Sequence, residues 1–234
     1  MDWQTLAHEF FGESHRIGQD GDLLCGEAVI EETGEPLTVV GTTNHAPIGV
    51  ALALAQARVV LDTMAKHPGR AILLLIDTQG QQLRRRDELL GINRAMAHLG
   101  CCIDLARRRG HRVLGVVYDQ ALSGGFITSG LIADACYAVP EAEIRVMRIP
   151  AMARVTKLPE ELLAGLSQSN PVFAPGVGNY VAMGGVRSLW ERNLRACLIA
   201  ALEGTPTRDE RALDGLKRGG RQLARHVMDE VLAA

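Results

Sequence analysis

Two glycine-containing stretches follow apolar, strand-like runs in the middle of the chain. "IDTQGQQL" (76–83) follows one run, and "ALSGGF" (121–126) follows the run "RVLGVVYD" (112–119). At a strand-to-helix turn, the first backbone N–H groups of the helix lack an acceptor and carry partial positive charge. Gly124 and Gly125 have no Cβ to block an oxygen that becomes negative during a reaction. The pattern therefore predicts an oxyanion-binding turn.

Other interpretations of these stretches remain open. The Gly-Gly pair also fits a structural role in which the helix packs closely on the strand. Phosphate binding is disfavoured, because neither GxxxxGK[ST] nor GxGxxG is present. Ser123 lacks the GxSxG frame of a hydrolase nucleophile and is interpreted as a turn or cap residue. Since consecutive parallel strands end near each other, we expect the two turns to flank one cleft.

Further polar residues lie near predicted strand ends or loops. His45 follows Asn44 and fits either a capping role or contact with a substrate carboxylate. Arginines are unfavourable near a helix N-terminus, so residues 84–86, all arginine, indicate either a solvated helix start or contact with a carboxylate or a carrier protein. The Gly/Pro-rich loop 168–187 has a length typical of functional loops, and its Asn170, Phe173 and Tyr180 are candidates to reach the cleft or a partner. No histidine or cysteine spacing predicts a metal site.

Composition limits the class of protein. The 234 residues are 47% hydrophobic and 22% charged, with a net charge of −2, so neither nucleic acid nor an anionic membrane is an expected partner. The longest apolar stretch, 47–61, contains Gln56 and Arg58 and is too polar to span a bilayer. The first residues show no signal peptide, and five cysteines without a CxxC pair predict reduced thiols in a cytoplasmic protein.

Hydrophobic periodicity predicts an α/β chain, organised as a single domain over 1–234 with a core at about 20–165 and a C-terminal loop and helices at 166–234. A hairpin is expected at 23–32 and 36–43, and a helix at 45–67 with Pro47 in its first turn. The remaining expected elements are strands at 71–80, 112–118 and 136–140, a long helix at 85–110, a short helix after the Gly-Gly turn, a strand and turn at 143–155, and C-terminal helices around 188–203 and 207–232.

In this order, the hairpin, the helix "NHAPIGVALALAQARVV" and the two turns resemble the acyl-CoA carboxyltransferase branch of the crotonase superfamily. That branch has "DTPG" and later "GGA". Here Gln79 replaces the proline, and Phe126 replaces the alanine and is expected to narrow the pocket. Over most of residues 20–190, including "IPAMARVTKLP" and "SNPVFAPGVGNYVAMGG", the chain resembles the γ subunits of malonate decarboxylases.

The resemblance implies a crotonase-like ββα superhelix of the carboxyltransferase type, with a helical C-terminal extension. It implies that the oxyanion donors are the backbone N–H groups of Gly124, Gly125 and Phe126. The candidate substrate-binding residues that follow from it are Thr78, Gln79, Gly80, His45 and Asn170.

The implied activity belongs to a complex. With a homologous β subunit, the chain is expected to decarboxylate a malonyl thioester to an acetyl thioester. The substrate is carried on the pantetheine-type arm of an acyl carrier protein, and an acyl-carrier transferase subunit is a further expected partner. No tightly bound cofactor is expected, and biotin is not required by this chain. A non-catalytic scaffold subunit and a stand-alone thioester isomerase or hydrolase are the alternatives.

Hydration of enoyl thioesters is disfavoured on the same resemblance. Hydratases of the superfamily use two glutamates, and the corresponding positions here are Thr128 and Ala151. Neither side chain acts as a general acid or base at neutral pH.

Overall fold

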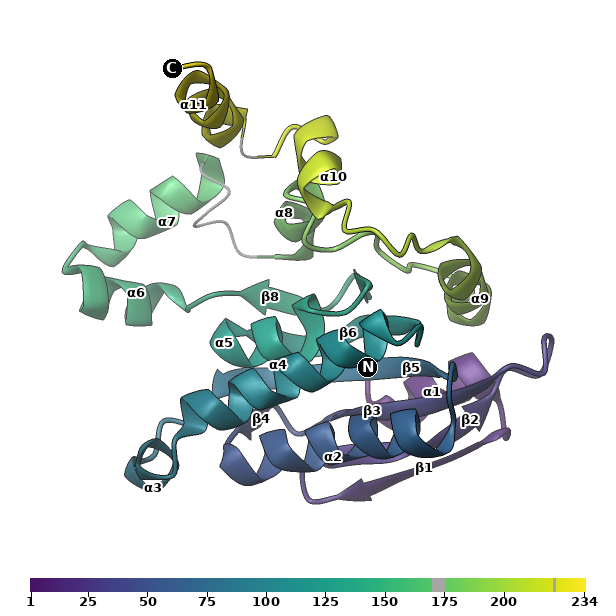
Figure 1. Cartoon of the computed structure of the whole chain (residues 1–234). Coiled ribbons are helices and arrows are strands. Elements are labelled where there is room, and N and C mark those ends of the chain that lie inside the picture. Colours follow the sequence, from purple (N-terminus) through teal and green to yellow (C-terminus); the bar gives the residue numbers. More distant parts are fainter. Residues whose placement is uncertain (170–175, 221) are drawn as a thin grey trace.

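The computed structural model describes residues 1–169, 176–220 and 222–234. An eight-stranded sheet forms its centre, in the order β1-β2-β3-β5-β6-β7, with β4 beside β5 and β8 beside β6 (Figure 1). The strands are β1 (His15–Asp20), β2 (Leu23–Val29), β3 (Pro36–Thr42), β4 (Ala46–Ile48), β5 (Ala71–Gln81), β6 (Val113–Leu122), β7 (Ala135–Ala138) and β8 (Glu143–Arg145).

The sheet has an antiparallel edge and a parallel centre. Strands β1, β2 and β3 pair antiparallel, whereas β3, β5, β6 and β7 pair parallel. The first eight residues of β5 are all buried, which explains its unbroken apolar run, because a central parallel strand is covered on both faces. The carboxyl ends of β5 and β6 therefore lie side by side.

Helices cover both faces of the sheet (Figure 1). On one face, α2 (Val50–Lys66) and α4 (Ile92–Arg108) enclose a core with the inward side chains of β5 and β6. On the other face, α1 (Trp3–Phe11) and α9 (Leu194–Gly204) complete a second core, in which the rings of Tyr137 and Trp190 stack at 4.5 Å. Helices before residue 20 and after residue 165 thus contribute to the interior, outside the range 20–165 that the sequence predicts for the core.

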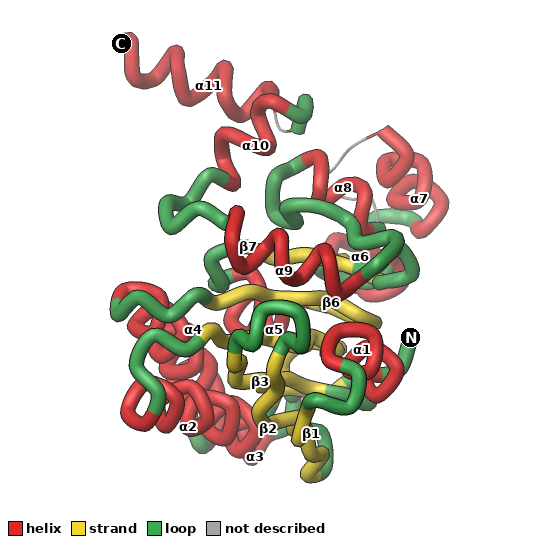
Figure 2. The backbone as a smooth tube through the Cα atoms, turned by 90° about the vertical axis from the view of Figure 1, so that its right-hand side faces the viewer, coloured by secondary structure: helices red, strands yellow, loops and turns green. Residues whose placement is uncertain are grey.

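Short helices connect and extend this body, and Figure 2 shows the C-terminal ones leading away from the sheet. They are α3 (Arg85–Leu89), α5 (Ser123–Phe126), α6 (Ile149–Thr156), α7 (Glu160–Ser169), α8 (Val177–Ala182), α10 (Arg211–Lys217) and α11 (Gln222–Ala233). A π-helical turn, η1 (Ile127–Leu131), continues α5 directly. Such turns are frequent at functional sites.

The predicted hairpin and the parallel strands are confirmed, but two predicted helices begin or end elsewhere. Pro47 lies in β4 rather than in a helical turn, and α2 starts only after Gly49, where Asp87 Oδ1 accepts the N–H of Val50 at 2.9 Å. The predicted helix 85–110 is two helices. Gly91 separates them with a left-handed φ of 77°, a conformation that glycine adopts without steric cost.

Other element predictions are corrected in the C-terminal half and at the N-terminus. The segment 143–155 contains helix α6 after strand β8, and the loop 168–187 contains α8. The predicted helix 207–232 is interrupted at Gly219, whose φ is 80°, and at Gly220, where a Cβ would lie 2.4 Å from the carbonyl oxygen of Ala182. Strand β1 and helix α1 have no counterpart among the predicted elements.

All five cysteines are free. Burial raises the pKa of the Cys136 thiol to about 12, so this sulfur is inert at neutral pH. Within the described residues, every helix is too short or too polar to cross a membrane. The single-domain organisation over 1–234 stays a prediction.

Candidate active site

The turn after β5 and the turn after β6 lie against each other. A Cβ on Gly125 would lie 2.8 Å from the carbonyl carbon of Gly80 and 2.9 Å from its Cα, closer than real side chains come to a backbone. Gly80 has a φ of 105°, which a residue with a side chain rarely adopts. The two turns therefore lie together at the carboxyl end of the sheet, and Gly125 is required by this contact whatever else it does.

A bulge in β6 brings the second turn into place. Ile76 pairs with Val117 and Thr78 pairs with Ala121, so three residues of β6 face one residue of β5. The start of β6 pairs with β7, and its last residues, from Gln120 onward, pair with β8. Bulges of this kind bend a strand and redirect its side chains, often beside active sites.

Ser123 and Gln81 cover the Gly-Gly turn from one side. Ser123 has a φ of 54°, and its hydroxyl donates a hydrogen bond to Gln81 Oε1 at 3.1 Å. A Cβ on Gly124 would lie 3.2 Å from the same Gln81 oxygen. The group that comes close to Gly124 in this chain is thus the side-chain amide of Gln81.

The predicted donors start a helical run at residues 123–131. The N–H groups of Ser123, Gly124 and Gly125 have no acceptor within that run, whereas Phe126 is its fourth residue and the first whose N–H can reach a helical carbonyl. The ring of Phe126 is 2% exposed and packs in the core, 6.3 Å from the ring of Tyr180. The ring therefore points into the interior of this chain, and its narrowing of a substrate pocket stays a prediction.

The predicted substrate-binding residues of the β5 turn have different environments. Thr78 is fully buried, and its hydroxyl donates to the carbonyl of Ala46 at 2.6 Å and accepts the N–H of Gly80 at 3.0 Å. Gln79 is exposed to solvent. Thr78 therefore fixes the backbone of the turn, and Gln79 presents its side chain outward.

His45 pairs with a buried carboxylate. Asp77, whose side chain is 4% exposed, lies with Oδ1 2.8 Å from His45 Nδ1 and accepts the backbone N–H of His45 on Oδ2 at 2.7 Å. It also accepts the N–H of Gln120, in the bulge, at 3.3 Å. Asn44 and His45 both have left-handed φ values, 60° and 50°. Asp77 therefore holds a strained turn in place, and the His45 side chain remains 48% exposed.

Asp119 completes a three-residue cluster that the sequence did not reveal. The ligand atoms of His45, Asp77 and Asp119 lie within 4.8 Å of one another, a grouping that could hold a cation. The oxygens of Asp77 already accept N–H groups, however, so this carboxylate is satisfied without a metal. Burial, and then the charge of Asp77, raise the pKa of Asp119 above the ordinary value for its carboxyl group, while His45 opposes the shift.

The remaining predicted residues are three arginines after the first turn and three residues of the loop 168–187. Arg84 and Arg86 line an open groove of about 720 Å³ beside Pro47 and Asp87. Asn170 and Phe173 lie outside the described residues, and Tyr180 is partly buried in α8.

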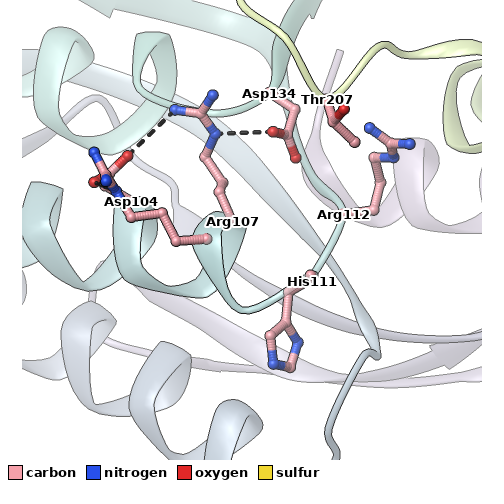
Figure 3. Close-up of a pocket in the computed structure, with 8 residues that line it drawn as sticks. Asp104, Arg107, His111, Arg112, Asp134 and Thr207 are labelled. Atoms are coloured by element: carbon pink, nitrogen blue, oxygen red, sulfur yellow. Dashed lines mark hydrogen bonds and ion pairs between the residues drawn. The ribbon is translucent and has the colours of Figure 1, made fainter.

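The opposite, amino-terminal end of the parallel strands carries a second polar pocket, of about 310 Å³ (Figure 3). Asp134 accepts Arg107 Nε at 2.9 Å on one oxygen and the N–H of Val113 at 2.8 Å on the other. Arg107 also donates to the carbonyl of Ile132 at 2.9 Å, and His111 Nδ1 lies 2.9 Å from the carbonyl oxygen of Arg70. These groups join the end of α4 to the start of β6 and serve the fold.

The architecture defines the class: a crotonase-like fold of the carboxyltransferase type. Among solved structures, the chain is similar to a Pseudomonas malonate decarboxylase hetero-tetramer in complex with coenzyme A, with a TM-score of 0.77, 24% identity, and coverage of 96% of this chain and 97% of that chain. It is also similar to transcarboxylase 12S, with a TM-score of 0.73, 21% identity, and coverage of 88% of this chain and 41% of that chain.

Sequence comparison gives the family. Residues 43–234 match the family described as malonate decarboxylase gamma subunit. The chain is 33% identical over 228 residues to a malonyl-S-ACP:biotin-protein carboxyltransferase of Malonomonas rubra, covering 90% of this chain and 78% of that protein. The chain belongs to the malonate decarboxylase gamma subunit family, as its resemblance predicted, and is a subunit of a carboxyltransferase-type decarboxylase.

Proposed function

We propose that this chain and a homologous β subunit form a shared site that converts a malonyl thioester, carried by an acyl carrier protein, to an acetyl thioester. A Pseudomonas malonate decarboxylase of the same fold has been solved as a hetero-dimer, which supports a heteromeric site. The observation that carries the chemical proposal is the contact between Gly80 and Gly125, which places two glycine turns at one end of the sheet.

The chemistry needs little more than charge stabilisation. When the bond between the carboxylate carbon and the α-carbon breaks, CO₂ leaves and the electron pair forms an enolate whose charge lies on the thioester oxygen. A proton then adds to the α-carbon. Backbone N–H groups at Gly124, Gly125 and Phe126 are the proposed donors to that oxygen, with Gly124 and Gly125 favoured because they precede the first helical hydrogen bond. Removing one such donor typically costs about 10²–10³-fold in rate.

The same proposal assigns supporting roles. The proposed substrate-binding residues contact the substrate or shape its binding site. They are Thr78, Gln79, Gly80, His45 and Asn170. The pantetheine-type arm of the carrier protein brings the thioester to the site, and an acyl-carrier transferase subunit loads the carrier. This chain itself needs no tightly bound cofactor and no biotin. Its five free cysteines support a cytoplasmic location.

Transfer of the carboxyl group to a biotin protein is a second candidate. It is favoured by the name of the Malonomonas rubra relative, a malonyl-S-ACP:biotin-protein carboxyltransferase. The two candidates share the enolate and differ only in the acceptor of the carboxyl group. Release of CO₂ in the absence of any biotin protein supports direct decarboxylation, and turnover only with a biotinylated carrier supports transfer.

A glycine substitution tests the donor role in the complex with the β subunit. A substitution at Gly125 cannot separate the loss of N–H donation from the loss of packing, because any Cβ there meets the Gly80 backbone. A Gly124 substitution can, since the Cβ would meet no backbone within 4 Å, but the flexible ends of the Gln81 side chain, at 3.2 Å, and of the Met96 side chain, at 3.9 Å. We expect Gly124→Ala to lower turnover of malonyl thioester by about 10-fold to 10²-fold with an unchanged melting temperature. Full activity of this variant, or robust decarboxylation by the chain alone, would contradict the proposal.

A further inference from the structure

The side-chain amide of Gln81 lies against the Gly-Gly turn. Its oxygen lies 3.1 Å from Ser123 Oγ, which belongs to a residue 42 positions further along the chain. The same oxygen lies 3.2 Å from the place of a Gly124 Cβ. Gln81 is the last residue of β5, so it reaches this position from a rigid strand.

The contact with Ser123 fixes the orientation of the amide. Between two oxygens at this distance the hydroxyl must donate, so Oε1 of Gln81 is the acceptor and the NH₂ group occupies the other branch of the amide plane. Among the described residues, none accepts a hydrogen bond from this NH₂ group. Within the described part of the chain, Gln81 therefore presents two free N–H donors beside the turn that carries the proposed oxyanion site.

Ser123 is held in an unusual conformation that makes this contact. Its φ of 54° is uncommon for a residue with a side chain, and such conformations persist only where neighbours impose them. Its Cβ lies 2.9 Å from the place of a Cβ on Gly80, so Gly80 lacks a side chain where Ser123 needs room. The two turns together thus place the serine hydroxyl against the glutamine.

We propose that the Gln81 side-chain amide is an additional hydrogen-bond donor to the oxygen that becomes negative in the reaction. Ser123 is the positioning residue that aims this amide. The proposal rests on the proposed function, because it concerns the same enolate oxygen. A side-chain amide is a known type of oxyanion donor, and its benefit is confined to the charged transition state.

Gln81→Glu in the complex with the β subunit tests the donor role at constant shape. Near neutral pH the introduced carboxylate accepts but does not donate, and it repels the developing charge. We expect kcat to fall by about 10²-fold or more, with little change in KM. As the pH is lowered, the introduced carboxyl group becomes protonated and regains a donor, so the kcat relative to wild type should rise again. A residue that only packs would not produce this pH profile.

Three further single variants and one double variant complete the test. Gln82→Glu places the same charge one position along the chain and should leave kcat and its pH dependence unchanged. Gln81→Ala should lower kcat by at least about 10-fold, and Ser123→Ala by a smaller factor. In the Gln81→Ala background, Ser123→Ala should have no further effect, because the amide that it positions is gone.

The outcomes separate this proposal from the proposed function. A wild-type kcat in Gln81→Glu and Gln81→Ala, in a complex that Gly124→Ala still impairs, overturns the role of Gln81 alone. Additive losses for Ser123→Ala and Gln81→Ala overturn the positioning role of Ser123. If Gln81→Glu fails to assemble, Gln81→Ala decides by the same kcat criterion. A complex with no activity on malonyl thioester overturns the proposed function first.

Discussion

The two ends of the same parallel strands are built differently. At the carboxyl end, Asn44, His45 and Ser123 have left-handed backbone conformations, β6 carries a bulge, and α5 continues into a π-helical turn. At the amino-terminal end, Arg107, Asp134 and the neighbouring backbone make ordinary hydrogen bonds (Figure 3). Since strain persists only where other interactions impose it, the irregular geometry at the carboxyl end supports the proposed site there.

A buried aspartate at each end sharpens the contrast. The side chains of Asp77 and Asp134 are 4% and 6% exposed, and both accept backbone N–H groups. Asp134 is paired with the guanidinium of Arg107, whereas Asp77 is paired with the imidazole of His45, a residue with a left-handed φ. The amino-terminal end is thus held by an arginine–aspartate ion pair, and the carboxyl end by a histidine–aspartate pair that anchors a strained turn.

Replacing Asp77, at the carboxyl end, should lower both stability and activity more than replacing Arg107, at the amino-terminal end. Asp77→Ala leaves the part-buried N–H groups of His45 and Gln120 without their acceptor, and the cost is about 1–3 kcal/mol for a fully buried group and less for a part-buried one. We expect a loss of about 2–4 kcal/mol and a fall in melting temperature of about 4–16 °C. Because the strained turn before β4 loses its anchor, the kcat of the folded complex should also fall, about 10-fold or more.

Calorimetry and turnover of the assembled complex measure the two effects of Asp77→Ala. His45→Gln, which keeps the backbone N–H bonded to Asp77, is the matched control and should retain most of the stability. A folded Asp77→Ala complex with normal kcat would show that the carboxyl end of the sheet is no more functional than the other end.

Arg107→Met should affect stability alone. Methionine keeps much of the aliphatic bulk, but Asp134 loses its charged partner while retaining the Val113 N–H. A hydrogen bond to a charged group is worth about 1.5–3 kcal/mol, so a fall of that size in unfolding free energy is expected. Denaturant unfolding gives the free energy, and kcat should stay within about 2-fold of wild type, since the pocket lies away from the proposed site. A large loss of kcat without a loss of stability would give the pocket of Figure 3 a functional role.

The elements that local pattern determines could be predicted from the sequence. The unbroken apolar runs of β5 and β6 predict buried parallel strands, and Pro68 with Gly69 predicts the end of α2. The break at Gly91 could not be predicted, because a single glycine is tolerated inside a helical pattern and only its φ of 77° identifies the break.

The site is less predictable than the fold, because its contacts join distant residues. The glycine turns and the DTQG stretch are visible locally, and family resemblance gives their significance. The His45–Asp77 pair spans 32 positions and the Gln81–Ser123 pair spans 42, and periodicity contains no information about either. The sequence predicts a turn role for Ser123, and the left-handed φ that supports this role also places its hydroxyl on Gln81.

The smallest expected effect is a pH dependence at Asp119. Burial and the charge of Asp77 raise the pKa of Asp119 in the folded chain above its ordinary value of 3.8, which serves for the unfolded chain. The folded state therefore holds this proton more tightly than the unfolded state does. Its stabilising contribution is fully present below pH 3.8 and is lost as the pH rises through the raised folded pKa.

Asp119→Asn removes this titration, so the variant should gain stability relative to wild type as the pH rises from 3.8 through that window, and the difference should then stay constant. The effect should be small, because the Asp119 side chain is 42% exposed and solvent screens it. Melting temperatures measured on both proteins across the acidic range test the expectation.

His45, 4.0 Å from Asp119, favours the charged carboxylate when protonated, so in a His45→Gln background the same difference should become larger. A difference that is independent of pH in both backgrounds would show that neither burial nor the charge of Asp77 raises the pKa of Asp119 in the folded chain.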